Sequence, residues 1–183
     1  MQAIRNRRSV REFTARPVDR VTIERLLEAA ALAPNHRMTQ PWRFYVLGPV
    51  ARRAYGAVLG GRKAKKIEDP EAARAVIDKV TAAHGNLPAM IAFAMVEDAN
   101  PETREEDYAA VMMAVQNFAL AAAAEGLATH IKTGAVMQDP GARAAVGVPD
   151  GQKIVAVVEL GEPAAVPLPK NRAPASQHTT FRD

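Results

Sequence analysis

Three arginines and a serine near the N-terminus are the first residues whose types and spacing could bind a ligand. They lie in the segment Asn6-Arg-Arg-Ser-Val-Arg-Glu-Phe13. Guanidinium and hydroxyl groups donate hydrogen bonds to anions such as phosphate, and the charge of the guanidinium strengthens them. Taken alone, this cluster is equally consistent with a solvated basic surface at the end of a short helix, which is expected over residues 1–6.

A second polar segment, Ala33-Pro-Asn-His-Arg-Met-Thr-Gln-Pro-Trp-Arg-Phe44, lies between two predicted elements. The helical spacing of apolar residues over 21–32 stops at Pro34, and a strand-like run begins at Trp42. His36 is the one group in this loop whose charge changes near neutral pH. A lone histidine in a loop is more often a surface residue, so this segment alone does not define a site.

Together, the two segments resemble the flavin-binding signature of the FMN-dependent nitroreductase family. The first matches Arg-Arg-Ser-x-Arg-x-Phe, and the second matches Ala-Pro, two polar residues, three variable positions and Gln-Pro-Trp-x-Phe. The resemblance extends from Arg7 to Arg172 and points to a short branch of NAD(P)H nitroreductases with a single domain. Met38 departs from the pattern, because many members carry Asn at that position.

The resemblance implies that the N-terminal segment binds FMN. Arg7 and Ser9 take the places of phosphate ligands, and Arg8 contributes through its backbone or side chain. Arg11 takes the place near the pyrimidine edge of the flavin, where a fixed cation favours the anionic reduced form.

Two other parts of the chain match residues that approach the flavin in this family. Lys170 and Arg172 resemble a Lys-x-Arg phosphate-binding element, although a disordered charged tail is the alternative. Asn35, His36 and Gln40 take positions from which a loop of one subunit reaches the flavin of its partner. The resemblance therefore implies an intertwined homodimer that shares FMN across its interface.

A short segment after the predicted third strand matches the part of the family that lies beside the isoalloxazine ring. It consists of Ile131, Lys132, Thr133 and Gly134. A backbone N–H near Thr133 or Gly134 is expected to face N5 of the flavin. Only backbone and small residues can approach the ring so closely, which suits Gly134.

The activity implied by the resemblance is ping-pong hydride transfer from NADH or NADPH, through flavin N5, to a nitroaromatic, a quinone or a similar small acceptor. No side chain is singled out as a catalytic acid or base. The alternatives are a flavin-binding dimer with a regulatory role, or a specialised relative that catalyses dehalogenation, dehydrogenation or flavin breakdown.

The predicted fold class is α+β, with a mostly antiparallel central sheet flanked by helices. The chain is expected to form one domain over residues 1–183, of which about 162–183 are an extended C-terminal tail. The spacing of apolar residues predicts four strands, which begin near Arg43, Pro88, Leu127 and Lys153.

Helices are predicted between these strands. One over about residues 50–59 is expected to be interrupted at Gly60-Gly61, and another covers 71–83. The longest, Tyr108–Glu125, is apolar on nearly every side, and a second subunit is its simplest cover. The carboxylates at 105–107 are expected to lie at the start of this helix, where they would complement its dipole.

Composition excludes several other classes of protein. The chain has no cysteine, which removes disulfides and thiolate chemistry, and its four histidines have no metal-binding spacing. No glycine-rich nucleotide-binding motif or Gly-x-Ser-x-Gly motif is present. The net charge of +4 would also suit nucleic acid, but the basic clusters lack interleaved aromatic residues. Without a long apolar run, the protein is expected to be cytoplasmic and not bound to a membrane.

Overall fold

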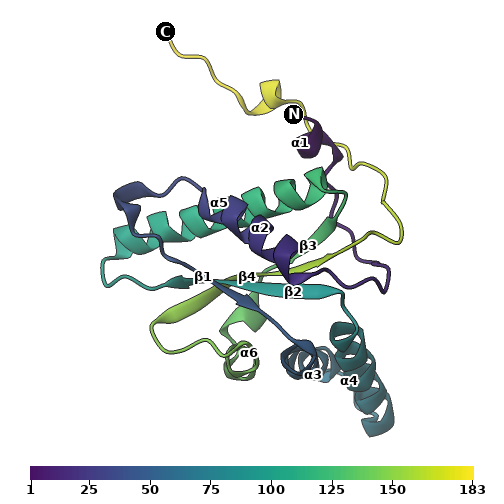
Figure 1. The fold of residues 1–183 in the computed structure, drawn as a ribbon. Helices are drawn as coiled ribbons and strands as arrows, with labels where there is room; N and C mark the ends of the chain where they lie inside the picture. Colours follow the sequence, from purple (N-terminus) through teal and green to yellow (C-terminus); the bar gives the residue numbers. More distant parts are fainter.

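A four-stranded antiparallel sheet lies between two layers of helices (Figure 1). The computed structural model describes residues 1–183. The strand order is β1-β2-β4-β3, and all three neighbouring pairs are antiparallel. The predicted α+β class and all four strands are confirmed. The strands are β1 (Trp42–Val46), β2 (Ala89–Val96), β3 (Ala128–Lys132) and β4 (Gln152–Gly161).

Five of the six α-helices cover the two faces of the sheet. Figure 1 shows α2 and α5 over one face and α3, α4 and α6 over the other. The helices are α1 (Gln2–Asn6), α2 (Arg20–Ala31), α3 (Pro49–Ala64), α4 (Pro70–Gly85), α5 (Pro101–Ala124) and α6 (Pro140–Val146). Three short 3-10 turns complete the chain: η1 (His36–Met38), η2 (Ala135–Gln138) and η3 (Ala175–His178).

The central strand β2 is apolar throughout because both of its faces are buried. Ile91 and Phe93 point into the core beneath α2 and α5, while Met90 and Ala92 point into the core beneath α3 and α6. All four residues are fully buried. The alternation of side chains along a strand therefore divides one apolar run between two cores.

The longest helix, α5, begins seven residues earlier than predicted, at Pro101. Asn100 caps it, because the side-chain oxygen accepts a 2.9 Å hydrogen bond from the backbone N–H of Glu102. The carboxylates at 105–107 consequently lie in its second turn, so the prediction that they mark the helix start is wrong. Glu106 and Asp107 bind the side chains of His36 and Thr39 instead. Tyr108 and Met113 remain 41% and 40% exposed, which leaves one side of α5 without a cover.

Helix α3 continues through Gly60-Gly61, and the predicted interruption is wrong. A Cβ atom on Gly60 would lie 2.9 Å from Cα of Ile77 in α4. The glycine therefore permits a close approach of two helices instead of ending one. Helix α4 follows after Asp69, whose side chain accepts hydrogen bonds from two backbone N–H groups in its first turn.

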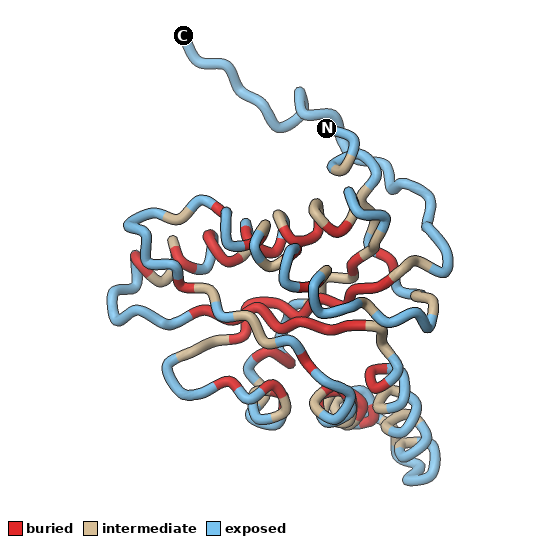
Figure 2. Tube along the Cα trace, viewed as in Figure 1, coloured by how far each residue is buried: buried red, intermediate tan, exposed pale blue.

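The last twenty residues, 164–183, are exposed along their whole length (Figure 2). The start of this tail is fixed to the N-terminal segment, because the backbone N–H of Ala164 donates a 2.9 Å hydrogen bond to the carbonyl of Glu12. The tail then passes close to the N-terminus in the view of Figure 1. Among the helices, none combines the length and the apolar character needed to cross a membrane.

Candidate functional site

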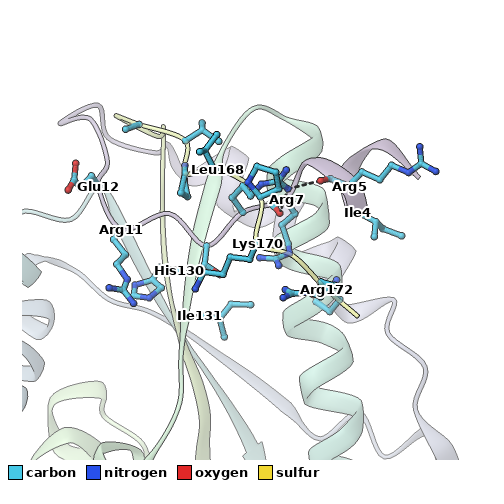
Figure 3. Close-up of a pocket in the computed structure, with 17 residues that line it drawn as sticks. Ile4, Arg5, Arg7, Arg11, Glu12, His130, Ile131, Leu168, Lys170 and Arg172 are labelled. Carbon is cyan, nitrogen blue, oxygen red and sulfur yellow. Dashed lines mark hydrogen bonds between the residues drawn. The ribbon is translucent and has the colours of Figure 1, made fainter. Parts of the chain in front are cut away.

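A cavity of about 1010 Å³ opens between the N-terminal segment, strand β3 and the C-terminal tail (Figure 3). These three parts are far apart in the sequence, and the fold brings them together at one edge of the sheet. Seven of the predicted cofactor-binding residues line the cavity: Arg7, Arg8, Ser9, Arg11, Ile131, Lys170 and Arg172.

The N-terminal segment reaches this position by pairing with the edge strand β3. Ser9 forms a parallel bridge with Thr129, and the backbone N–H of Val10 donates a 3.1 Å hydrogen bond to the Thr129 carbonyl. Val10 is buried, with 2% of its surface exposed. Because side chains alternate along an extended segment, Ser9 and Arg11 then point away from the core and line the cavity.

The lining of the cavity is strongly cationic. Arg5 joins the five predicted cations, while Glu12 is the only carboxylate in the lining. The Arg8 guanidinium already uses part of its hydrogen-bonding capacity within the chain, since it donates hydrogen bonds of 2.6 and 3.0 Å to the carbonyls of Arg5 and Arg7. Within this cluster, Arg8 therefore has a structural role as well. A concave surface with this charge attracts anionic ligands.

The segment after β3 turns sharply at Gly134. Its backbone has φ 110° and ψ −171°, a combination that is essentially restricted to glycine. Thr133 and Gly134 are both exposed, directly beyond the strand whose residues His130 and Ile131 line the cavity. The backbone here is accessible to a ligand, although neither residue is part of the cavity lining itself.

Lys132 lies on the same face of β3 as His130 and joins a polar cluster, which we call the Glu159 cluster and define as His84, His130, Lys132 and Glu159. The Lys132 ammonium bonds to the Glu159 carboxylate and lies 3.3 Å from Nε2 of His84. The second carboxylate oxygen of Glu159 lies 2.9 Å from Nδ1 of His130. Lys132 therefore does not line the cavity in this chain.

Electrostatics explain how a carboxylate persists in this buried position. Burial alone would raise the pKa of Glu159, but the hydrogen bond from His130 and the charge of Lys132 outweigh that effect and lower the pKa. Burial also lowers the pKa of His84, and the nearby Lys132 charge acts in the same direction. Burial, assisted by the charge on Glu159, raises the pKa of Tyr55 to about 12.

The loop with Asn35, His36 and Gln40 lies away from the cavity of its own chain. The Nδ1 atom of His36 lies 2.9 Å from the Oε1 atom of Glu106, which is in the second turn of α5. Gln116, ten residues further along α5, lines the cavity. At 1.5 Å per residue, the loop contact and the cavity are about 15 Å apart along the helix.

Comparison with known proteins identifies the family to which this fold and sequence belong. The model of the Nitroreductase family matches residues 4–162. The chain belongs to the nitroreductase family. Among relatives of the family, the Bacillus subtilis protein named "Putative NAD(P)H nitroreductase YfhC" is 31% identical over 177 residues, which cover 97% of this chain and 91% of YfhC.

Solved structures agree with this assignment. The nitroreductase-like family protein from Bacillus cereus is 30% identical and superposes with a TM-score of 0.85, covering 99% of this chain and 94% of its own. The NADPH:FMN oxidoreductase from Vibrio harveyi, solved with NAD⁺, has a TM-score of 0.79 at 18% identity, with coverage of 100% and 76%. The second comparison shows a shared fold.

Sequence reasoning missed three members of the Glu159 cluster in this nitroreductase-family protein: His84, His130 and Glu159. Two signals could have indicated them. His130 and Lys132 lie two positions apart in a predicted strand, so they share one face. Glu159 interrupts an apolar strand, and a charged residue in such a strand is rarely buried without partners. In contrast, the contribution of His84 from α4 required the tertiary fold.

Proposed function

We propose that the cationic cavity binds FMN and that the protein is an FMN-dependent oxidoreductase. It would transfer a hydride from NADH or NADPH to a nitroaromatic, a quinone or a similar small acceptor, in a ping-pong sequence. Membership of the nitroreductase family supports the broader class, an NAD(P)H-dependent oxidoreductase. The convergence of seven signature residues on one cavity supports FMN in particular.

The chain's own residues fit the chemistry of this cofactor. Arg7 and Ser9, with Lys170 and Arg172 from the tail, line the cavity and would bind the phosphate dianion. Arg11 would lie at the pyrimidine edge, where negative charge develops on reduction. When bound, FMN supplies the N5 atom that accepts and returns the hydride. The protein contributes positioning and electrostatic stabilisation.

The backbone around Gly134 supports the same orientation. A glycine at φ 110° has no side chain to separate its peptide group from a planar ring. We place the N–H of Thr133 or Gly134 opposite N5. Ile131, which lines the cavity from the same strand, would contact the ring through its apolar side chain.

A homodimer completes the proposed site. The loop with Asn35, His36 and Gln40 is about 15 Å from its own cavity along α5, but the same loop on a second copy could reach the cavity across an interface. The uncovered side of α5, with Tyr108 and Met113, supports an interface there. We expect an obligate contact that buries roughly 2,000 Å² or more.

Anaerobic visible spectroscopy tests this function. The purified protein should be yellow, and addition of NADH or NADPH without oxygen should bleach the flavin band. An added nitroaromatic or quinone should then restore the colour. A protein that stays colourless with added FMN would contradict the proposal, whereas bound flavin that neither nucleotide reduces would favour a regulatory flavin-binding dimer.

A further inference from the structure

The Glu159 cluster connects the buried side of β3 to the candidate FMN cavity through one residue. His130 lies in both: its Nδ1 atom is 2.9 Å from Oε2 of Glu159, and the residue lines the cavity. The Glu159 side chain is 6% exposed and that of His130 is 18% exposed. His130 is therefore a partly accessible imidazole that is held from behind by a buried carboxylate.

The other contacts of the cluster leave Glu159 with little freedom to turn. Its Oε1 atom bonds to the ammonium of Lys132 and lies 3.8 Å from Nε2 of His84. His84 is fixed in turn, because its Nδ1 atom is 2.8 Å from the carbonyl of Val80 and must donate to it. Its Nε2 atom is then the acceptor that faces Lys132. With Oε1 engaged, Oε2 remains directed at His130.

A carboxylate can only accept hydrogen bonds. The lowered pKa of Glu159 keeps it ionised at neutral pH. The Nδ1 atom of His130 must therefore carry a proton. In the neutral imidazole the other nitrogen, Nε2, has no proton and is a hydrogen-bond acceptor. The cluster thus selects one tautomer of a residue that lines the cavity.

Acceptor side chains are few in the rest of the cavity, where they are those of Ser9, Glu12 and Gln116. The lysine and arginine side chains of the lining can only donate hydrogen bonds. They suit the phosphate and the carbonyl oxygens of a flavin. The pyrimidine edge of an oxidised flavin also has one donor, the N3–H group, which none of these cations can satisfy. Figure 3 shows the side chains of Arg11 and His130 in the same cavity.

We infer that Glu159 is a positioning residue that fixes His130 with Nε2 as an acceptor, and that this atom accepts a hydrogen bond from N3–H of the bound flavin. The inference rests on the proposed function, since it requires FMN in the cavity with its pyrimidine edge near Arg11. It assigns to His130 a contact that the arginines and lysine of the lining cannot make.

Binding of FMN and of N3-methyl-FMN, in which a methyl group replaces the hydrogen on N3 and removes the donor, tests the inference. Wild-type protein should prefer FMN by on the order of tenfold. The His130→Ala variant should bind both flavins with similar affinity. Glu159→Gln should lower the preference, because the new amide can donate to Nδ1 and favour the other tautomer. Glu68→Gln, at an exposed position, is the matched control and should keep the wild-type preference.

The outcomes separate the inference from the proposed function. Absence of FMN binding would contradict the function itself. FMN binding without preference over N3-methyl-FMN in wild-type protein would overturn the inference alone. Because Glu159→Gln removes the charged partner of the partly buried Lys132 and could unfold the chain, a second measurement uses wild-type protein labelled with ¹⁵N in histidine. The His130 resonances, assigned with His130→Ala, should show the neutral ring protonated on Nδ1, and protonation on Nε2 would overturn the inference.

Discussion

The side-chain oxygen of Asn35 accepts a 2.6 Å hydrogen bond from the backbone N–H of Gln40. This bond closes a loop in which Arg37, Met38 and Gln40 all have positive φ, at 61°, 51° and 44°. Such conformations cost energy for residues other than glycine. The Asn35 amide also donates to the carbonyl of His36 and to the Thr39 hydroxyl, so one side chain holds the whole turn.

Replacement of Asn35 by Ala should therefore destabilise the loop. We expect the free energy of unfolding to fall by about 1–2 kcal/mol, because the N–H of Gln40 and the Thr39 hydroxyl lose a partner. Urea denaturation measures this change. Gln177→Ala, in the exposed tail, is the control and should have no effect. Equal stability of the two variants would show that the loop does not depend on Asn35.

Gly134 and Gly61 form a matched pair for a test of backbone strain. A Cβ atom would meet nothing within 4 Å at either position, but only Gly134 has a positive φ. Gly134→Ala should destabilise the fold by about 1–3 kcal/mol. Gly61→Ala, in the interior of α3, should stabilise it by up to about 1 kcal/mol. Thermal or urea unfolding measures the change in stability of each variant. Changes in the same direction for both variants would contradict this account.

The pKa of His84 predicts how stability depends on pH. Burial lowers this pKa below the usual 6.5, so the unfolded chain takes up a proton at higher pH than the folded chain. The stability that neutral His84 contributes is therefore complete above pH 6.5 and is lost as pH falls through the pKa of the folded state. Over this range the free energy of unfolding should fall by up to about 1.4 kcal/mol per pH unit. The pKa of Glu159 is also lowered, from 4.5, so the stability that this carboxylate contributes is lost only below pH 4.5.

Unfolding free energies measured from pH 7 to pH 5 test this prediction. The wild-type protein should lose stability over this range, and His84→Gln should flatten the profile. His178→Gln, in the exposed tail, is the control and should retain the wild-type slope. A profile of His84→Gln that is as steep as that of the wild type would exclude His84 as the cause.

Arg7 tests the phosphate site. It lines the cavity and has no carboxylate within ion-pair distance. Arg7→Ala should weaken FMN binding by about 1–3 kcal/mol, through the loss of a charge-assisted hydrogen bond. Arg182→Ala, near the end of the tail, removes the same charge away from the cavity. Fluorescence titration with FMN measures both, and equal affinities would indicate that the N-terminal cluster is only a solvated surface.

The order of elements could be predicted from the sequence, and so could the N-terminal residues that line the cavity. The apolar run at β2 and the spacing of apolar residues in α4 depend on neighbours along the chain, and the structure contains both elements. The predicted interruption at Gly60 was wrong because glycine is found both at the ends of helices and where two helices pack closely. Only the contact with Ile77 in α4 distinguishes the two roles.

Partners distant in sequence explain what could not be predicted within the site. Lys132 was expected beside the flavin, but Glu159 from the neighbouring strand binds its ammonium, and Lys132 is not part of the cavity lining. Whether Lys132 contacts a bound flavin stays a prediction. The pairing of Lys132 with Glu159 depends on strand register, which requires the turn lengths and core packing of the complete sheet.

Subunit complementation tests the central claim, that each flavin is held by arginines of one copy and the loop of the other. One chain carries Arg7→Ala and Arg11→Ala, and the other carries Asn35→Ala and His36→Ala. Both homodimers should bind FMN weakly. Heterodimers isolated with two affinity tags contain one site with every residue intact, so they should regain about half of the wild-type flavin content. Heterodimers that bind no more FMN than the homodimers would contradict the shared site.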